Sequence, residues 1–310
     1  MTNRILFIVM LVAGLTAPFF AYPVFVMDLL CFALFACAFN LLLGYAGLLS
    51  FGHAAFFGGA AYIAGYVTKE WGFGPLIGIL TGTGFALVLG TLFGYLAIRR
   101  QGIYFAMVTL ALAQIIYFLA LQMPFTGGEN GLQRIPRGDL FGFIDLNNDL
   151  AMYYFVFAIF LVGFGIIYRT IHSPFGEVLQ AIRENESRAL SLGYDIDHFK
   201  LMAFVLSATL AGMAGAAKAI IFQFASLTSA HWQTSGEVIL MTLVGGLGTI
   251  FGPVLGAITV GALSHELSSF GSWVQVILGV IFVVCVMTFR RGIIGEFQHR
   301  LERRKNQRET

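Results

Sequence analysis

Charged residues are scarce in this chain: Asp, Glu, Lys and Arg make up 11% of its 310 residues, whereas 58% are hydrophobic. A soluble domain carries about 25% charged residues, so this composition excludes an ordinary soluble domain. The mean hydropathy of +0.83 indicates a polytopic membrane protein. A formal net charge of +2 gives no bulk basicity that would favour nucleic acid as a partner.

Motifs for catalysis and metal binding are missing as well. The three cysteines, Cys31, Cys37 and Cys285, lie inside apolar runs without the spacing of metal ligands, so we expect small buried side chains. The six histidines are scattered and form no H-E-x-x-H pattern. Residues 264–266 read Ser-His-Glu, but neighbours on a helix point in different directions and cannot form a hydrolase triad. The sequence therefore predicts no catalytic residue and no metal site.

A phosphate-binding loop of the form G-x-x-x-x-G-K-[S/T] is also missing. Any ATP that drives this protein must therefore be bound by another chain, and we expect no cofactor on this one. Acidic residues do not cluster in the middle of an apolar run, so the sequence does not suggest a proton relay.

What the chain has in abundance is long apolar runs, and these predict an all-α polytopic membrane protein of about ten transmembrane or partial-membrane segments. The run after Arg4 resembles a signal peptide, but Pro18 follows the best small residue, Ala17, and we expect a retained span. The ten runs cover 5–21, 24–43, 53–68, 75–98, 103–123, 151–168, 201–223, 237–247, 251–267 and 271–289.

Two stretches must be broken. The stretch 24–68 carries one charge, Asp28, and as a single helix it would be roughly 67 Å long, over twice the thickness of the hydrocarbon core. Its glycines mark a break at 44–52. The stretch 237–267 has a similar break at 245–253, and the part before it is too short to cross alone, which indicates a partial helix shielded by its neighbours.

Charge asymmetry predicts the orientation. With ten segments and a cytoplasmic N-terminus, 14 of the 18 Lys and Arg residues fall inside, only Lys69, Arg134 and Arg137 fall outside, and Lys218 lies near the outer end of a span. Both termini are then cytoplasmic. We expect one transmembrane domain, 1–290, with a cytoplasmic loop at 169–200 and an outer loop at 124–150, followed by a basic cytoplasmic tail at 291–310.

The cytoplasmic loop holds a charged, helix-like segment, 173–193. Ser173 is suited to cap its start, Pro174 fits the first turn and Gly193 can close the end. Apolar residues recur along it at helical spacing, and charged residues occupy the other faces. Such a helix either contacts a partner in the cytoplasm or is an ordinary solvated loop.

The two broken stretches resemble each other, since both have closely spaced glycines followed by Phe-Gly. Matching Gly/Pro-broken segments are typical of a transport pathway, although the polar residues near them are equally suited to hydrogen bonds between helices. The third span, 53–68, is rich in Ala and Gly, which favours close helix packing. The candidate residues of the path and its hinges are Asn40, Gly44, Gly47, Ser50, Phe51, Gly52, His53, Thr109, Gly245, Gly246, Gly248, Gly252 and Pro253.

Six motifs in this order resemble the permease subunits of branched-chain amino acid ABC importers, most closely the LivM type, over about residues 25–290. They are F-N-L-L-L-G-Y-A-G-L-L-S-F-G-H-A-A-F-F-G-G-A-A-Y (39–62), G-I-Y-F-A-M-V-T-L-A (102–111), T-G-G-E-N-G-L (126–132), A-I-R-E-N-E-S-R-A-L-S-L-G (181–193), K-L-M-A-F-V-L-S-A-T-L-A-G-M-A-G (200–215) and G-G-L-G-T-I-F-G-P-V-L-G-A (245–257).

This resemblance implies a bacterial inner-membrane importer. It implies a second permease subunit of the LivH type, two cytoplasmic ATPases that bind ATP and magnesium, and a periplasmic binding protein that delivers a hydrophobic amino acid. The outer loop would dock the binding protein through Thr126, Gly127, Gly128 and Gly131. The charged segment would be the coupling helix, with Glu177, Arg183, Glu184, Asn185, Glu186, Arg188 and Gly193 facing the ATPase.

Two alternatives stay open at this point. Similar permeases carry urea and short amides, so the solute is not fixed by the motifs. A channel or facilitator that works without nucleotide is a further possibility, but it has no need of a structured cytoplasmic docking helix.

Overall fold

The computed structural model describes residues 2–140, 142, 144–267, 271, 273–288 and 292. Over these residues, each of the ten predicted apolar segments is a helix, which confirms the all-α fold class. The ten are α1 (Thr2–Phe20), α2 (Pro23–Asn40), α3 (His53–Glu70), α4 (Pro75–Ala97), α5 (Ile103–Gln122), α6 (Asp149–Ile171), α9 (Ile196–Phe222), α10 (Trp232–Gly245), α11 (Gly252–Leu267) and α12 (Val274–Thr288). The predicted basic tail lies almost wholly outside the described residues.

Shorter elements connect these helices. A π-helical turn, η1 (Leu41–Tyr45), continues α2, and two short helices, α7 (Pro174–Glu184) and α8 (Glu186–Ser191), lie between α6 and α9. The loop after α5 contains the 3₁₀ turns η2 (Pro124–Thr126) and η3 (Gly128–Asn130), and η4 (Leu227–Ala230) precedes α10. Two antiparallel ladders pair β1 (Leu132–Gln133) with β4 (Phe224–Ala225) and β2 (Asp139–Leu140) with β3 (Ile144–Asp145).

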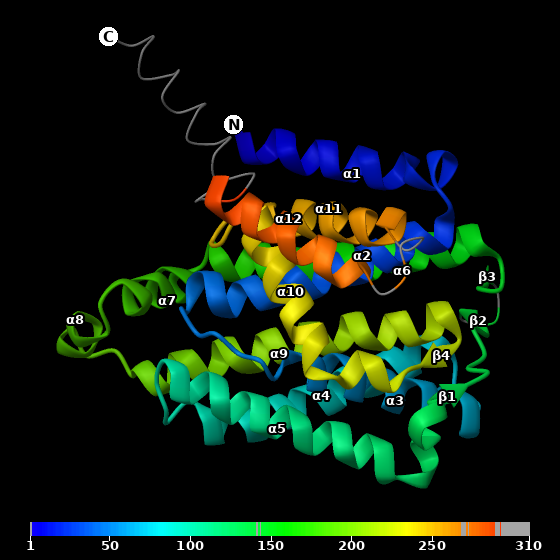
Figure 1. Cartoon of the computed structure of the whole chain (residues 1–310), viewed down its shortest axis with the longest axis horizontal. Coiled ribbons are helices and arrows are strands. Elements are labelled where there is room, and N and C mark those ends of the chain that lie inside the picture. The colour runs from blue at the N-terminus through cyan, green and yellow to red at the C-terminus, as the bar shows by residue number, and fades with distance from the viewer. Residues whose placement is uncertain are drawn as a thin grey trace.

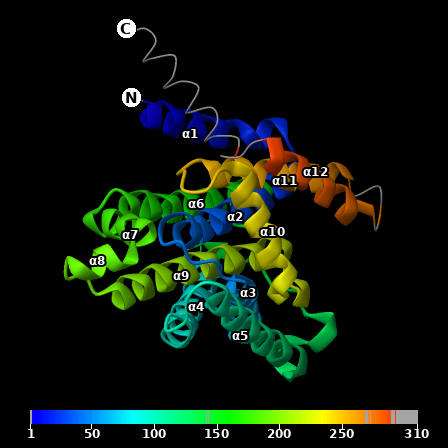
Figure 2. The ribbon, with the colours of Figure 1, turned by 60° about the vertical axis from the view of Figure 1, so that its left-hand side comes forward.

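The long helices run back and forth between two ends of the bundle (Figure 1). One end carries α7 and α8, and we call it the helix-pair end. The other carries the loop 123–148 and the turn 223–231, joined by the β1–β4 ladder, and we call it the loop end. Figure 2 shows the same separation after rotation, with α7 and α8 projecting beyond the other helices.

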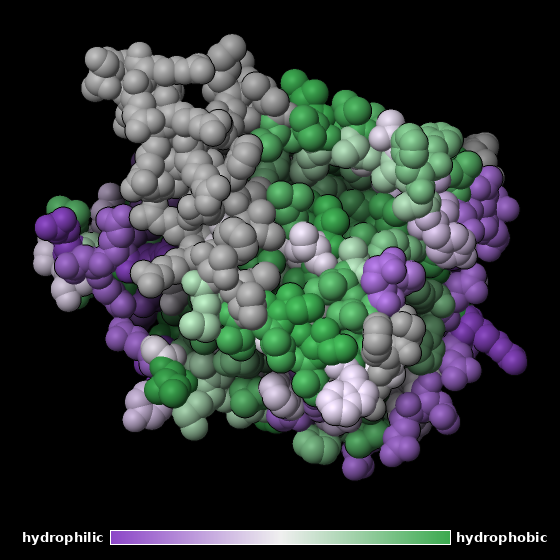
Figure 3. Space-filling view, turned by 45° about the horizontal axis from the view of Figure 1, so that its top comes forward, coloured by the Kyte–Doolittle hydropathy of each residue, from purple (hydrophilic) through white to green (hydrophobic). Residues whose placement is uncertain are grey.

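Length and apolarity suffice for a membrane crossing in five of the helices that the structure describes: 23–45, 75–97, 103–122, 149–171 and 196–222. The space-filling view shows a broad hydrophobic face between hydrophilic residues that gather at the two ends (Figure 3). At about 1.5 Å per residue, the 14 residues of α10 span only about 21 Å, less than a hydrocarbon core of about 30 Å. The prediction of a partial helix here is therefore consistent with its length.

The centre of the bundle is α2, α3 and α9, whose facing residues are almost completely buried. Side chains are small where α3, α4 and α9 meet, so the backbones approach closely. A Cβ atom at Gly82 of α4 would lie 2.6 Å from the Ala60 carbonyl oxygen and 3.0 Å from Ala216 Cβ. Helix association in a membrane depends on such packing rather than on hydrophobic burial. Close packing, the preferred interpretation of the Ala/Gly-rich third span, agrees with these contacts.

Gly82 and Gly84 on α4 give a direct test of this packing, because nothing lies within 4 Å of a Cβ at Gly84. We expect Gly82→Ala to destabilise the protein by about 1–3 kcal/mol through overpacking, and Gly84→Ala to have little effect. The measurement is the temperature at which half of the detergent-purified protein leaves the monodisperse peak on size exclusion. Equal shifts for the two variants would contradict the packing described.

Candidate functional site

The first break lies between α2 and α3. The α-helix widens into the π turn η1, and the chain then runs without helical structure until His53. Gly47 adopts φ +72°, a left-handed conformation that favours glycine. Single π turns inside helices are frequent at functional sites. The break therefore falls where the glycines of 44–52 predicted it.

The second break, 246–251, separates α10 from α11 and confirms that 237–267 is two segments. Its backbone turns at Gly246, with φ +121°, and at Gly248, with φ +73°. A side chain at Gly245 would collide with the Gly252 carbonyl, and the chain enters α11 directly through Pro253. The ends of α10 and α11 are thus in backbone contact.

Asn40 joins the two breaks, although it lies over 200 positions from its partners in the sequence. Its Nδ2 donates to the Thr249 carbonyl at 2.8 Å, and its Oδ1 accepts from the Gly248 amide at 3.0 Å. The Asn40 side chain is buried. The Asn40 side chain thereby pairs one backbone donor, the Gly248 amide, and one backbone acceptor, the Thr249 carbonyl, in a segment that has no helical hydrogen bonds.

Arg183 of α7 reaches the same place from the helix-pair end. Its guanidinium donates to the Gly44 carbonyl, and its stem passes over Gly47, where a Cβ would lie 3.1 Å from Arg183 Cγ. A Cβ at Gly248 would lie 3.3 Å from both Arg183 Nη1 and the Gly44 oxygen. Gly44, Gly248 and Arg183 therefore converge, and with Gln180 and Glu184 they line a cleft of about 520 Å³.

A second polar cluster lies deeper in the bundle, around His53. His53 Nδ1 is 3.1 Å from Ser50 Oγ, and His53 Nε2 is 2.9 Å from Ser207 Oγ, which donates to the Ala38 carbonyl. Phe39, Phe56 and Phe204 surround the imidazole edge-on. This cluster ties α2, α3 and α9 together, and both Ser50 and His53 are fully buried.

Thr109 of α5 holds the end of the first break. Its hydroxyl accepts from the Phe51 amide at 3.2 Å and donates to the Ala106 carbonyl at 2.9 Å, and Gly52 packs against its backbone. In this conformation Asn40, Ser50, His53 and Thr109 are thus all buried hydrogen-bonding residues between helices or chain segments, the alternative that the sequence left open.

Three residues that the sequence analysis did not select belong to these networks. Ser207 bonds His53, Ser235 accepts from the Ala54 amide at 2.8 Å, and Thr249 bonds both Asn40 and the Gly252 amide. A serine or threonine inside an apolar helix is common, so its type and position gave no signal. Only the pairing across the bundle distinguishes these three residues.

The charged segment differs from the expectation of one helix. The chain breaks at Asn185, which ends α7 and whose Oδ1 caps α8 by accepting from the Arg188 amide at 2.9 Å. Ser173 stands at the start of α7 but makes no capping bond, because its hydroxyl donates to the Thr170 carbonyl instead. Gly193 follows α8 with φ +89°, as its predicted role at the helix end requires.

Several of the predicted coupling residues are engaged within this chain. Glu186 pairs with Lys200 at 2.9 Å and accepts from Gln101 at 2.8 Å, which fixes α8 to α9 and to the turn between α4 and α5. Arg183 points to the breaks rather than away from the bundle. The exposed charged residues that remain are Glu177, Glu184 and Arg188.

The predicted docking residues shape the loop end from within. Thr126 is buried and its hydroxyl donates to the Ala120 and Met123 carbonyls. Gly127, with φ +79°, and Gly131 occupy positions where a side chain would strike the backbone, against the Gly131 and Ala225 carbonyls respectively. Gly128 adopts φ +58° in the same turn. Gly127, Glu129 and Asn130 are exposed, whereas Thr126 and Gly131 are buried.

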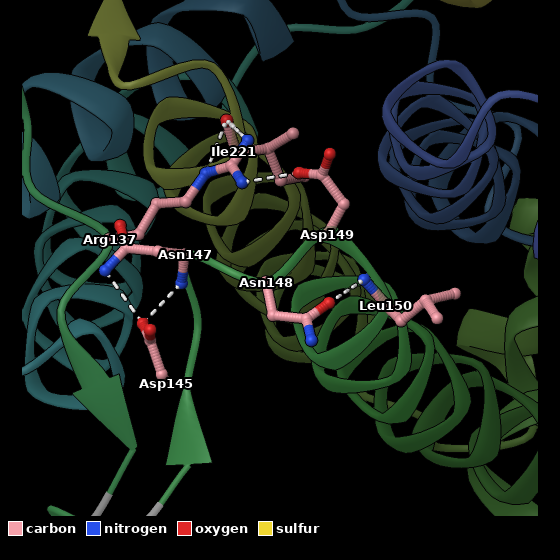
Figure 4. Close-up of polar contacts among 7 residues, drawn as sticks. All are labelled: Arg137, Asp145, Asn147, Asn148, Asp149, Leu150 and Ile221. Carbon is pink, nitrogen blue, oxygen red and sulfur yellow. Dashed lines mark hydrogen bonds and ion pairs between the residues drawn. The ribbon is translucent and has the colours of Figure 1, made fainter.

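Arg137 fastens this loop to the bundle (Figure 4). Its guanidinium donates to Asp149 Oδ1 at 2.7 Å and, through Nη2, to the Ile221 carbonyl at 2.9 Å. Asn148 caps α6 by accepting from the Leu150 amide at 3.0 Å. The loop is therefore held between the end of α9 and the start of α6.

Comparison with known proteins places these features in a family. The family described as "Branched-chain amino acid transport system / permease component" matches residues 21–286, which include both breaks, α7 and the loop. The chain belongs to this family of membrane permeases. It is thus a transport component rather than an enzyme, and the residues that the structure describes hold no group of metal-ligating side chains.

The relatives are transport permeases of two kinds. The chain is 29% identical over 283 residues to the Escherichia coli "High-affinity branched-chain amino acid transport system permease protein LivM", covering 82% of this chain and 65% of that one. A probable LivH permease of Methanocaldococcus jannaschii is 29% identical over 53% of each chain. The Escherichia coli ribose import permease RbsC is 27% identical over 48% of each chain. No solved structure matches.

Asn40 provides a test of the contact between the breaks. We expect Asn40→Leu to destabilise the permease by about 1–3 kcal/mol, because the Gly248 amide and the Thr249 carbonyl would be left unpaired. Thr209→Val is the matched control, since the Thr209 hydroxyl bonds only the Val205 carbonyl of its own helix. Thermal unfolding of the purified protein measures the stability of both variants. If Thr209→Val were as unstable as Asn40→Leu, the hydrogen bonds of Asn40 to the second break would contribute no more than a bond within one helix.

Proposed function

We propose that this permease is one of two membrane subunits of an ATP-driven importer, and that it forms part of the path for branched-chain and other hydrophobic amino acids. The observation that carries the proposal is the placement of Arg183. Its guanidinium connects α7, at the helix-pair end, to Gly44 of the first break and lies close to Gly248 of the second. A nucleotide-independent facilitator has no use for such a link.

The α7–α8 pair is suited to receive an ATPase. Leu179 and Ile182 are buried against the bundle, while Glu177, Glu184 and Arg188 are exposed. A force on the exposed side would displace α7 as a unit, and Arg183 would carry this displacement to Gly44 and Gly248. We infer that ATP and magnesium are bound by two partner ATPases, because this chain has no phosphate-binding loop.

The two breaks are the proposed gate of the path. Their backbones meet through Gly44 and Gly248, where side chains are absent and small rotations change the distance between segments. Among the described residues, Asn40 hydrogen-bonds to the second break, and the Arg183 guanidinium hydrogen-bonds to Gly44 of the first break and lies close to Gly248 of the second. Weakening these contacts would let the two stretches move apart.

The relatives support the proposed partners and solute. LivM relatives belong, by their names, to high-affinity branched-chain amino acid transport systems, and a LivH relative shares half of this chain. We infer a LivH-type second permease and a periplasmic binding protein that docks at the loop end, where Glu129 and Asn130 are exposed. The chain spans 65% of the length of the Escherichia coli LivM.

The proposed location is a bacterial inner membrane, with the helix-pair end in the cytoplasm. Most Lys and Arg residues fall on the side of the membrane that holds this end, and this excess supports the orientation. Single cysteines at Arg188 and at Glu129, in a background without Cys31, Cys37 and Cys285, test it with a membrane-impermeant maleimide on intact cells. We expect labelling at position 129 and, at 188, labelling only after permeabilisation. The reverse labelling pattern would show that the protein has the opposite orientation in the membrane.

Reconstitution with the second permease, the ATPases and the binding protein tests the function. We expect wild-type proteoliposomes to take up leucine only with ATP, and not ribose. Arg183→Met should lower the uptake of leucine per ATP hydrolysed about tenfold, because α7 is no longer connected to the breaks. Arg183→Lys keeps the charge and should keep part of the coupling.

Arg99→Met is the matched control, since Arg99 is an exposed arginine at the same end that follows α4 and bonds Tyr95 of that helix. It should transport normally. An unchanged ratio of uptake to hydrolysis in Arg183→Met would remove Arg183 from the coupling route. Uptake of ribose instead of leucine would contradict the proposed solute but not the assignment as an importer.

A further inference from the structure

A cavity of about 410 Å³ lies between α1 and the helices α2, α6 and α11. Figures 1 and 2 both show α1 along the outside of the bundle. The residues that α1 contributes to the lining recur at the spacing of one helix face: Leu6, Met10, Ala13 and Ala17. None of these four is fully buried, although they face the cavity and the helices behind it. The inner face of α1 is therefore incompletely covered by the protein.

The lining of this cavity offers no free polar group. Tyr153 is the one polar side chain among the described residues that line it, and its hydroxyl donates to the Gly14 carbonyl at 2.6 Å. Water needs several polar partners to remain in a cavity. An amino acid would leave its ammonium and carboxylate groups unpaired here, at a high cost. The cavity therefore suits an occupant without polar groups, which excludes the proposed solute.

The dimensions of the cavity match those of one acyl chain. Leu6 and Ala17 are eleven positions apart on α1, which is roughly 16 Å along the helix. The hydrocarbon of one leaflet is about 15 Å thick, half of a core of about 30 Å. Apolar cavities of about 150 Å³ already bind small apolar molecules. A volume of about 410 Å³ therefore leaves room for a much longer apolar guest.

The exposure of the lining residues shows where such a guest would enter. Leu255 and Ile258 of α11 line the cavity and are 41% and 39% exposed, and Val9 of α1 is 58% exposed. Phe157 and Phe160 of α6 line it as well, but they are almost completely buried. The lining thus leads from the surface between α1 and α11, where a bilayer surrounds the protein, to a buried aromatic wall.

We propose that this cavity binds one acyl chain of a membrane phospholipid. The chain enters between α1 and α11 and packs against Phe157 and Phe160, where an empty space would leave both rings without partner atoms on one side. It also contacts Phe251, which lines the cavity at the end of the second break. A lipid thereby becomes part of the packing around this break. The inference goes beyond the proposed function and does not depend on which solute is carried.

Photolabelling tests the site in the membrane complex, purified through a tag on this chain with whatever subunits accompany it. The complex is placed in nanodiscs of phosphatidylethanolamine and phosphatidylglycerol. The probe is a phosphatidylethanolamine with a diazirine in the middle of one acyl chain, and mass spectrometry maps the labelled residues. We expect labelling of Phe157 and Phe160, which bulk lipid does not reach. Phe105, buried outside the cavity, should remain unlabelled.

Substitutions on α1 show whether the label enters through the cavity. We expect Ala13→Phe to lower the labelling of Phe157 and Phe160 about tenfold, because its ring occupies the space of the chain. Ala17→Leu fills the cavity at a second position and should act in the same direction. Val12→Phe is the matched control, since Val12 is the neighbouring residue, is 52% exposed and does not line the cavity. The yield of monodisperse complex reports whether each variant is folded.

Two results would overturn the lipid site. One is a wild-type protein labelled on the outer face of α1 but not at Phe157 or Phe160. The other is labelling of these two residues that neither Ala13→Phe nor Ala17→Leu reduces.

A further measurement examines the competing occupant, a helix of another subunit. The photoreactive residue p-benzoylphenylalanine is placed at Leu255, and we expect it to capture phospholipid. Capture of a second permease subunit instead would assign the cavity to a subunit interface and overturn the lipid site. The labelling requires neither ATP nor solute, so a failure of leucine import would contradict the proposed function without affecting this result.

Discussion

The structure depends on one constraint: a polypeptide that leaves helical geometry inside a membrane must still pair its backbone amides and carbonyls. Two stretches do so here, and the Asn40 side chain pairs the second of them through the Gly248 amide and the Thr249 carbonyl. An unpaired polar group in hydrocarbon costs several kcal/mol, which exceeds most contacts between apolar helices. The Asn40 amide therefore fixes the end of α2 against the second break, and the close approach of Gly44 to Gly248 holds the two breaks together.

The same constraint explains why Arg183 is where it is. A carbonyl freed by the π turn at Gly44 needs a donor, and the nearest one comes from α7 rather than from another transmembrane helix. A helix that lies outside the bundle thereby becomes part of the hydrogen bonding inside it. The exposed charges Glu177 and Glu184 and the guanidinium of Arg183 at Gly44 belong to the same helix, so we expect force on the exposed side to reach Gly44 without any intermediate loop.

Much of the fold was predictable from the sequence, because hydrophobic length and glycine position are local properties. The ten helices, both breaks and the division of 237–267 follow from them. The site was predictable only in part. Asn40, Gly44 and Gly248 were identified, but their pairing across 208 positions was not, since nothing in one sequence shows which polar residues meet. The resemblance assigned Arg183 to the surface that faces the ATPase, and only the structure showed its hydrogen bond to Gly44. Asn185 was not recognised as the residue that ends α7 and caps α8, because the spacing of apolar residues continues through it.

The short helix α10 shows how the same constraint acts at the second break. It begins at Trp232 beside the loop end, and its last residue, Gly245, is in backbone contact with Gly252 at the start of α11. Its 14 residues extend roughly 21 Å, less than a hydrocarbon core of about 30 Å. A helix of this length leaves the backbone that follows it to be paired by other segments, and the Asn40 side chain does so for the Gly248 amide and the Thr249 carbonyl. The shortness of α10 and the buried amide on α2 are therefore two parts of one arrangement.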